Sequence, residues 1–253
     1  MCLLALSWQQ HPHYPMLLAA NRDESLQRPT RPACFWPEQP NLLGGKDLEA
    51  GGSWLLASKE GRWATLTNFR DGRDLTPGKI SRGELVLQAL QQPLEDLPSW
   101  LEEKQQDFAG FNLLWGNSHQ AWYFSNRLAT TARLLTPGLY ILSNATLDTD
   151  WPKTQRLRRK VEEWLATDNC HPSQLFATLE DQARADDKDL PNTHVGIQIE
   201  RQLSPIFISA EGYGTRTSTL LWQEASGDWN LHEKNHSTDQ NLSNEQHFKW
   251  QGS

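Results

Sequence analysis

The amino-terminal segment MCLLALSWQQHPHYPMLLAANRDE, residues 1–24, decides how the rest of the chain is interpreted. It contains two apolar runs, residues 2–8 and 16–20, separated by a link that holds Pro12 and Pro15. Short apolar runs on either side of such a link are typical of a β-hairpin. Since the second run leads directly into the polar residues 21–24, a hairpin would bring that cluster close to Cys2.

Cys2 is a candidate nucleophile because of its position. Aminopeptidases remove an initiator methionine readily when the next residue is small, so removal of Met1 would leave a thiol and a free α-amine on one residue. An α-amine has a pKa of about 7.7–8.0, and an appreciable fraction is therefore neutral near pH 7. It can then act as the general base for its own thiol, directly or through one water. The alternative is that Cys2 is only a small apolar residue that begins a strand.

The polar cluster after the second run could serve such a nucleophile. Arg22 near a thiol would lower its pKa, and a carboxylate from Asp23 or Glu24 could hold the α-amine. Strand alternation places Arg22 and Glu24 on one face, with Asn21 and Asp23 on the other. The alternative interpretation is a solvated charged turn.

Three further polar residues are candidates for the same site. Asn68 and Asn144 each close an apolar run, 63–68 and 139–144, and a side-chain amide at a strand end can stabilise an oxyanion. Asparagine is also a common turn residue. Arg216 follows a glycine-rich bend, where it could bind a carboxylate or phosphate or simply lie on the surface.

The remaining pattern predicts an α+β protein in which two sheets pack together between helical layers. Prolines between residues 29 and 40 indicate a long irregular loop, and Ser81 with Glu84 forms a capping-box pattern. Strands are predicted at 53–58, 63–68, 111–115, 120–124, 139–143, 195–200, 204–209, 218–223 and 229–231, and helices at 82–90, after Ser99, at 152–166 and at 173–183. We expect one domain over residues 1–233 and a polar, disordered tail over 234–253.

Composition excludes several classes of function. The chain has 24 basic and 31 acidic residues, a net charge of -7, which argues against nonspecific nucleic-acid binding. No apolar run approaches the roughly 20 residues of a membrane span, and the start lacks the features of a signal peptide. Three cysteines do not form a disulfide framework, so a cytoplasmic protein is expected. The eight histidines are scattered without a metal-ligand spacing, so we predict no metal site. No GxSxG elbow supports a Ser-His-Asp triad.

Several short motifs occur together and in order along the chain. They are Asn-Arg-Asp-Glu at 21–24, Leu-Gly-Gly-Lys-Asp at 43–47, Gly-Gly-Ser-Trp at 51–54, Thr-Asn-Phe-Arg at 67–70, Ser-Arg-Gly-Glu-Leu at 81–85, Gly-Phe-Asn-Leu at 110–113, Leu-Ser-Asn at 142–144, Leu-Ser-Pro-Ile-Phe-Ile at 203–208 and Gly-Thr-Arg-Thr-Ser at 214–218. From residue 1 to about 231, the sequence resembles the NRDE family, which includes the eukaryotic transport and Golgi organisation protein 2.

This family is similar to the choloylglycine hydrolase and penicillin V acylase branch of the N-terminal-nucleophile hydrolases. The resemblance implies a four-layer αββα sandwich of two antiparallel sheets. It also implies site roles for an N-terminal cysteine, an arginine and an acid on the second strand, two asparagines and a late arginine. In this sequence those roles fall on Cys2, Arg22, Asp23 or Glu24, Asn68, Asn144 and Arg216. Arg22 and Asp23 are adjacent here, whereas the acylases separate their arginine and acid, so the acid that meets the α-amine is left open.

Two classes of function follow from the resemblance. One is a hydrolase of a small-molecule amide or thioester that requires no cofactor. The other is a non-catalytic carrier or chaperone of haem or acyl-CoA and other lipids on the same fold, with Cys2 or a histidine on the haem iron. A protein that only binds other proteins is a third, less favoured interpretation.

Overall fold

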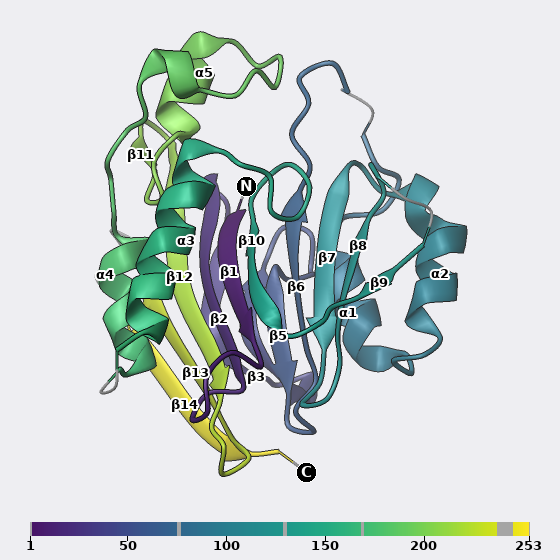
Figure 1. Cartoon of the computed structure of the whole chain (residues 1–253). Coiled ribbons are helices and arrows are strands. Elements are labelled where there is room, and N and C mark those ends of the chain that lie inside the picture. Colours follow the sequence, from purple (N-terminus) through teal and green to yellow (C-terminus); the bar gives the residue numbers. More distant parts are fainter. Residues whose placement is uncertain (1, 75–76, 129–130, 168–169, 237–244, 253) are drawn as a thin grey trace.

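The computed structural model describes residues 2–74, 77–128, 131–167, 170–236 and 245–252, and two antiparallel β-sheets form its centre (Figure 1). The hairpin predicted at the amino terminus lies in the middle of the first sheet, where β1 (Cys2–Trp8) pairs with β2 (Met16–Ser25). The full strand order is β10 (Gly138–Leu142), β1, β2, β12 (Tyr213–Gln223), β13 (Asp228–Asn235) and β14 (Glu245–Gln251), and the short β11 (Ser209–Ala210) pairs with β12.

The second sheet follows the chain without a crossover. Its strands are β3 (Thr30–Trp36), β4 (Gln39–Asp47), β5 (Leu55–Ser58), β6 (Trp63–Asn68), β7 (Phe111–Gly116), β8 (Ala121–Ser125) and β9 (Arg133–Leu134). The strands predicted at 63–68, 111–115 and 120–124 correspond to β6, β7 and β8, and the strand predicted at 53–58 contains β5; β5 pairs with β6 and β7 with β8. Asn68 is the last residue of β6, as the sequence indicated.

Helices cover the outer face of each sheet (Figure 1). Apolar side chains of α1 (Gly83–Gln91) and α2 (Leu97–Lys104) pack on the second sheet, and those of α3 (Pro152–Leu165) and α4 (Leu175–Leu179) pack on the first. The 3-10 turns are η1 (Gln105–Asp107), η2 (Pro172–Gln174) and η3 (Asp187–Asp189), and α5 (Ile197–Leu203) lies at one end of the sandwich. The predicted four-layer αββα fold is confirmed.

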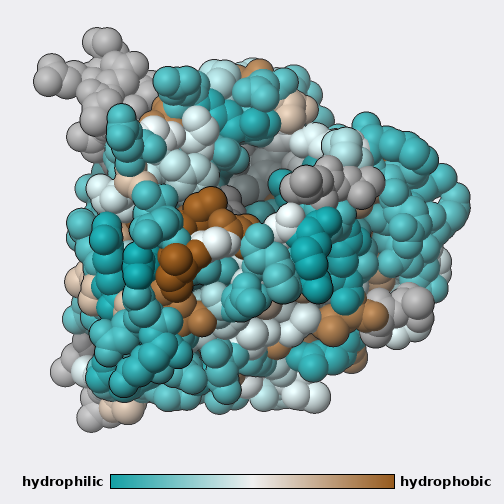
Figure 2. Space-filling model, turned by 90° about the horizontal axis from the view of Figure 1, so that it is seen from above, coloured by the Kyte–Doolittle hydropathy of each residue, from teal (hydrophilic) through white to brown (hydrophobic). Residues whose placement is uncertain are grey.

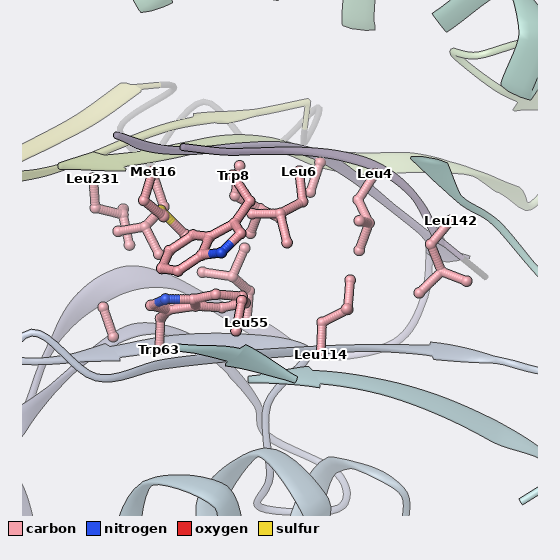
Figure 3. Close-up of a cluster of buried hydrophobic side chains, with 14 of the residues drawn as sticks. Leu4, Leu6, Trp8, Met16, Leu55, Trp63, Leu114, Leu142 and Leu231 are labelled. Atoms are coloured by element: carbon pink, nitrogen blue, oxygen red, sulfur yellow. The ribbon is translucent and has the colours of Figure 1, made fainter. Parts of the chain in front are cut away.

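The core between the sheets fixes the strand that carries Cys2. Leu4, Leu6 and Trp8 of β1 point toward the second sheet, where the Trp8 ring faces Trp63 (Figure 3). Each of these side chains is almost fully buried, and burying one such side chain stabilises the fold by about 1.5–3 kcal/mol. Leu3 instead belongs to the cluster under α3 and α4. Because strand residues alternate between faces, Cys2 has the orientation of Leu4 and faces the space between the sheets.

Two of the predicted irregular segments are strands. The loop predicted between residues 29 and 40 is β3, the turn at Pro37 and the start of β4. Proline is tolerated there because β3 is the edge strand of its sheet and its pairing shifts register between Arg31 and Cys34, beside Pro32. The tail predicted to be disordered contains β14, which pairs with β13. Residues 237–244 of that tail lie outside the described residues.

The prediction of a strand at 195–200 is wrong, because these residues begin α5. Val195, Ile197 and Ile199 alternate with other residues in the way that a strand would, but Gly196 has a φ of 90° and starts a helix. No strand spans 204–209 either; only Ser209 joins β11. The Ser81–Glu84 pattern also fails as a capping box, because Glu84 accepts a hydrogen bond from Gln88 instead.

Within the described residues, no helix is both long enough and apolar enough to span a lipid bilayer.

Candidate active site

The central hairpin places Cys2 directly opposite Arg22, at the open end of the sandwich. A cavity of about 150 Å³ lies beside these two residues, between the ends of the two sheets. Its walls come from β1 and β2, from the loop before β5, from β6 and from the start of α1. The lining residues are Cys2, Arg22, Asp23, Glu24, Arg28, Asp47, Ser53, Trp54, Leu66, Asn68, Ser81, Arg82 and Gly83.

Cys2 is buried, with 9% of its surface exposed. Burial raises the pKa of the thiol and the charge of Asp23 raises it further, whereas the positive charge of the chain's amino terminus, Arg22 and the backbone of Asp23 lower it. The expectation that Arg22 lowers the pKa of this thiol is therefore correct in sign, but desolvation outweighs it. A nucleophile at this position needs a base to take its proton.

Arg22 is held by its neighbours within the cavity. Its Nη1 donates to Thr30 Oγ1 at 3.0 Å, and its guanidinium lies 4.1 Å from the centre of the Trp54 ring. Only 5% of the residue is exposed. Burial lowers the pKa of Arg22, which nonetheless stays charged because arginine titrates so far above neutral pH.

The two acidic residues after Arg22 differ in environment, although both line the cavity. Asp23 is 1% exposed, and its Oδ1 accepts a hydrogen bond of 2.7 Å from Thr215 Oγ1. Burial raises the pKa of Asp23, and the positive charge of Lys153 lowers it. Glu24 is half-buried and accepts a hydrogen bond from the backbone of Ser25. The charge of Asp23 also raises the pKa of the Cys2 thiol.

Asn68 and Asn144 lie in contact, but only Asn68 lines the cavity. Asn144 Nδ2 donates to both the backbone oxygen and the side-chain Oδ1 of Asn68, each at 3.0 Å. Asn144 is fully buried and does not line the cavity, whereas Asn68 does. Next to it, Ser143 Oγ donates to the backbone oxygen of Cys2 at 3.4 Å, which ties this segment to β1. Because Oδ1 of Asn68 accepts from Asn144, Nδ2 is the donor that Asn68 retains for a ligand.

Arg216 is not among the residues that line the cavity. Its Nη1 donates to the backbone oxygens of Ser25, Leu26 and Arg28 at 2.8, 3.1 and 3.0 Å. A register shift between Thr215 and Thr217 accompanies this placement. Arg216 therefore supports the turn that carries Arg28, and any effect it has on the cavity is indirect.

Several cavity residues were not predicted from the sequence. Arg28 and Asp47 form a salt bridge of 2.8 Å at the rim. Arg82 precedes α1 and donates to the backbone oxygen of Gly110 at 3.2 Å. Arg82 and Asp47 both fall within motifs that support the family resemblance, and this was the available signal. Charged residues usually lie on the surface, so the charge of Arg82 and Asp47 does not by itself mark them as cavity residues.

Lys153 is a further residue near the site that was not predicted from the sequence. It is the second residue of α3, is 2% exposed and donates from Nζ to the backbone oxygen of Leu203 at 3.1 Å. Burial lowers its pKa to about 8, while the negative charge of Asp23 opposes the shift. Nearby, the Tyr213 hydroxyl donates to the backbone oxygen of Asp23 at 3.1 Å. A lysine in the first turn of a polar helix gives no sequence signal of burial.

The described residues contain no group of three or more histidine, cysteine, aspartate or glutamate side chains arranged to hold a metal ion.

The four-layer αββα sandwich is the fold of the N-terminal-nucleophile hydrolases. The structure is similar to that of a mutant of the conjugated bile acid hydrolase of Clostridium perfringens, with a TM-score of 0.50. The similarity covers 100% of this chain and 98% of that one at 8% sequence identity, and it therefore concerns the fold alone.

The chain belongs to the Transport and Golgi organisation 2 family, whose sequence profile matches residues 1–238. It is 32% identical over 250 residues to the Transport and Golgi organization protein 2 homolog of Homo sapiens. It is 33% identical over 254 residues to the homolog of Bos taurus. Each alignment covers 90% of both chains.

Proposed function

We propose that the protein is an N-terminal-cysteine hydrolase that cleaves an amide or thioester bond after Met1 has been removed. The observation that carries this proposal is the position of Cys2, which begins a central strand opposite Arg22 and lines a cavity shared with Asn68 and Asp23. The set combines a nucleophile, a positive charge, an amide donor and a buried acid in one place.

In the first half of the reaction, the α-amine of Cys2 takes the thiol proton and the sulfur attacks the carbonyl carbon of the substrate. The carbon–oxygen double bond becomes a single bond, and the negative oxygen is stabilised by Nδ2 of Asn68. When the intermediate collapses, the bond to the leaving group breaks and the α-ammonium returns the proton to it. The acyl group stays on the sulfur as a thioester.

In the second half, the α-amine takes a proton from water, and the resulting hydroxide attacks the thioester carbon. Collapse breaks the carbon–sulfur bond, releases the carboxylic acid and restores the thiol. Asp23, which is buried and acts electrostatically on Cys2, would orient the ammonium form of the terminal amine between these steps. Asn144 is a positioning residue, because it holds the amide of Asn68.

Labelling with an activated acyl ester, followed by intact mass and peptide mapping, tests the proposal. We expect a single acyl group on an amino-terminal peptide that lacks Met1. Cys34 and Cys170 provide internal controls, since neither is in a disulfide and neither lines this cavity. Labelling of Cys34 or Cys170 in preference to Cys2 would contradict the proposal.

A further inference from the structure

We infer that the cavity beside Cys2 binds an anionic group of the substrate between Arg22 and Arg82, while an apolar part of the same molecule lies in the groove along α5. The inference deepens the proposed function, on which it rests for the position of the reacting carbonyl. It identifies the substrate class as acyl compounds with a carboxylate or phosphate-type oxygen group close to the scissile bond.

Arg22 is a buried cation that no carboxylate neutralises at contact distance. Its hydrogen bond goes to the neutral hydroxyl of Thr30, and its face lies on Trp54. Across the described part of the chain, no carboxylate oxygen forms a salt bridge with it within 4.0 Å. A charged group that has lost most of its hydration is costly to bury, and an incoming anion would offset that cost.

Arg82 presents a second such guanidinium to the same cavity. Its one hydrogen bond to a described residue goes to the backbone oxygen of Gly110, and it too forms no salt bridge with a described carboxylate. It stands at the start of α1, whose first residue, Gly83, also lines the cavity. The amino terminus of a nine-residue helix adds partial positive charge at this point.

The glycine opposite this helix end allows the cavity wall to form. A Cβ on Gly52 would lie 2.5 Å from the carbonyl carbon of Gly83, so only glycine permits this approach. The loop before β5 therefore packs directly on the start of α1, and Ser53 and Gly83 become neighbouring parts of the wall.

Two guanidinium groups of the cavity, those of Arg22 and Arg82, have no described carboxylate at contact distance. Arg28 is occupied by Asp47 and Glu49, at 2.8 and 3.1 Å. Asp23 is hydrogen bonded to Thr215 and lies in the field of Lys153. Glu24 acts on both Arg22 and Arg82, and Asp47 acts on Arg22, but neither acid forms a salt bridge with these arginines. An anion of the substrate would give the two guanidinium groups a partner at contact distance.

The apolar half of the proposed ligand has a separate place. A groove of about 410 Å³ adjoins the cavity and shares Glu24, Asn68 and Arg82 with it. Its other side chains include Phe69, Val195, Ile199 and Leu203. Figure 2, which views this end of the molecule, shows apolar side chains gathered together on the surface, and Ile197 and Ile199 of α5 are each 45% exposed. Asn68, the proposed oxyanion donor, lines both the cavity that holds Arg22 and Arg82 and the groove along α5.

Binding to the Cys2→Ala variant tests the inference without turnover. Isothermal titration calorimetry measures the binding of each probe. The probes are N-octanoylglycine, its neutral amide N-octanoylglycinamide and N-octanoyl-aminomethylphosphonate, and N-acetylglycine is the short-chain control. We expect at least one anion to bind about tenfold or more tighter than the neutral amide, as charge-assisted hydrogen bonds allow. The carboxylate and phosphonate arms decide which oxyacid the cavity prefers. N-acetylglycine should bind more weakly than N-octanoylglycine.

The arginine assignment is tested by adding Arg82→Gln or Arg22→Gln to that variant. Either change should reduce the preference for the anion to less than about threefold. Arg159→Gln, on the exposed face of α3, is the matched control and should leave the preference unchanged. Because Arg22 also packs on Trp54, the circular dichroism of its variant is checked, and Arg82→Gln provides the independent test.

Equal binding of anionic and neutral probes would overturn the inference, as would an anion preference that survives Arg82→Gln. Absence of binding for every probe at about 1 mM, which corresponds to about -4 kcal/mol, would also overturn it. Turnover by the unmodified protein is measured separately. Anion-selective binding without turnover would contradict the hydrolase proposal and support the anion subsite. Equal turnover of anionic and neutral substrates would support the hydrolase proposal and contradict the anion subsite.

Discussion

At the scale of single residues, the site separates a reacting group from the groups that hold it. Cys2 and Asn68 both line the cavity, and Asn144 lies outside it and holds the side chain of Asn68. Asn68 and Asn144 look equivalent in sequence, but this division predicts that replacing them will have different effects on kcat.

Asn68→Ala should lower kcat for an acyl substrate by about 10²–10³, the usual cost of losing one oxyanion donor. Asn144→Ala should have a smaller effect, because Asn68 would be misplaced but not lost. The control is the rate at which iodoacetamide alkylates Cys2, a reaction that forms no oxyanion and should change little in either variant. A kcat that is unchanged in Asn68→Ala would remove Asn68 from the mechanism.

At the scale of elements, buried ionisable groups join strands and helices that are distant in sequence. Glu233 of β13 accepts a hydrogen bond of 2.8 Å from the backbone nitrogen of Ala33 in β3, which joins the two sheets. Glu200 of α5 forms a buried salt bridge of 2.9 Å with Arg70, just after β6. Each junction gives a stability prediction.

Glu233→Gln should make the free energy of unfolding less dependent on pH. Burial raises the pKa of Glu233 to about 7, from an ordinary value of 4.5. The folded state therefore binds the proton more tightly, and this contribution to stability is full below pH 4.5 and is lost as the pH rises to about 7. The loss amounts to about 3 kcal/mol at 1.36 kcal/mol per pKa unit.

Urea denaturation at a series of pH values measures this effect. The difference in stability between Glu233→Gln and the unmodified protein should shift in favour of the variant as the pH rises through this window. Glu103→Gln, at an exposed position of α2, is the control. A difference that stays constant with pH would show that Glu233 titrates normally.

Glu200→Gln should release α5 from the rest of the molecule. Glu200 also accepts hydrogen bonds from the backbone and hydroxyl of Thr193, at 2.8 and 2.6 Å. The change removes the carboxylate that pairs with the buried Arg70. Breaking such a pair costs about 3–5 kcal/mol. Hydrogen exchange should speed up over residues 191–203. Arg201→Gln, whose partner Asp187 is exposed, should cost less than about 1 kcal/mol. Equal protection of the segment in both variants would contradict this role.

At the scale of the whole molecule, sequence patterns predicted the layers better than the cavity. The central hairpin follows from two apolar runs and their proline link, and the positions of Cys2, Arg22 and Asn68 follow from that hairpin and from β6. The strands at β3 and β14 were missed, because proline and polar residues are tolerated at sheet edges. At α5, alternating isoleucines imitate a strand, while a buried ion pair fixes a helix.

Long-range packing accounts for what the sequence could not predict at the site. Arg82 and Lys153 enter from helices that cover opposite sheets, and neither carries a local pattern that marks it as buried. Arg216 carried a plausible pattern, but a register shift in β12 turns its side chain toward the backbone of residues 25–28. Short polar motifs therefore identified the region of the site without assigning each side chain to it.

The most direct test compares the chain that begins at Cys2 with the same chain that retains Met1, produced with methionine aminopeptidase inhibited. Only the first form has the α-amine on the residue that carries the thiol. The second-order rate of acylation of Cys2 at pH 8 should be about 10²-fold or more higher in that form, as expected for a positioned general base. Equal rates in the two forms would contradict the central claim that Cys2 acts as an N-terminal nucleophile.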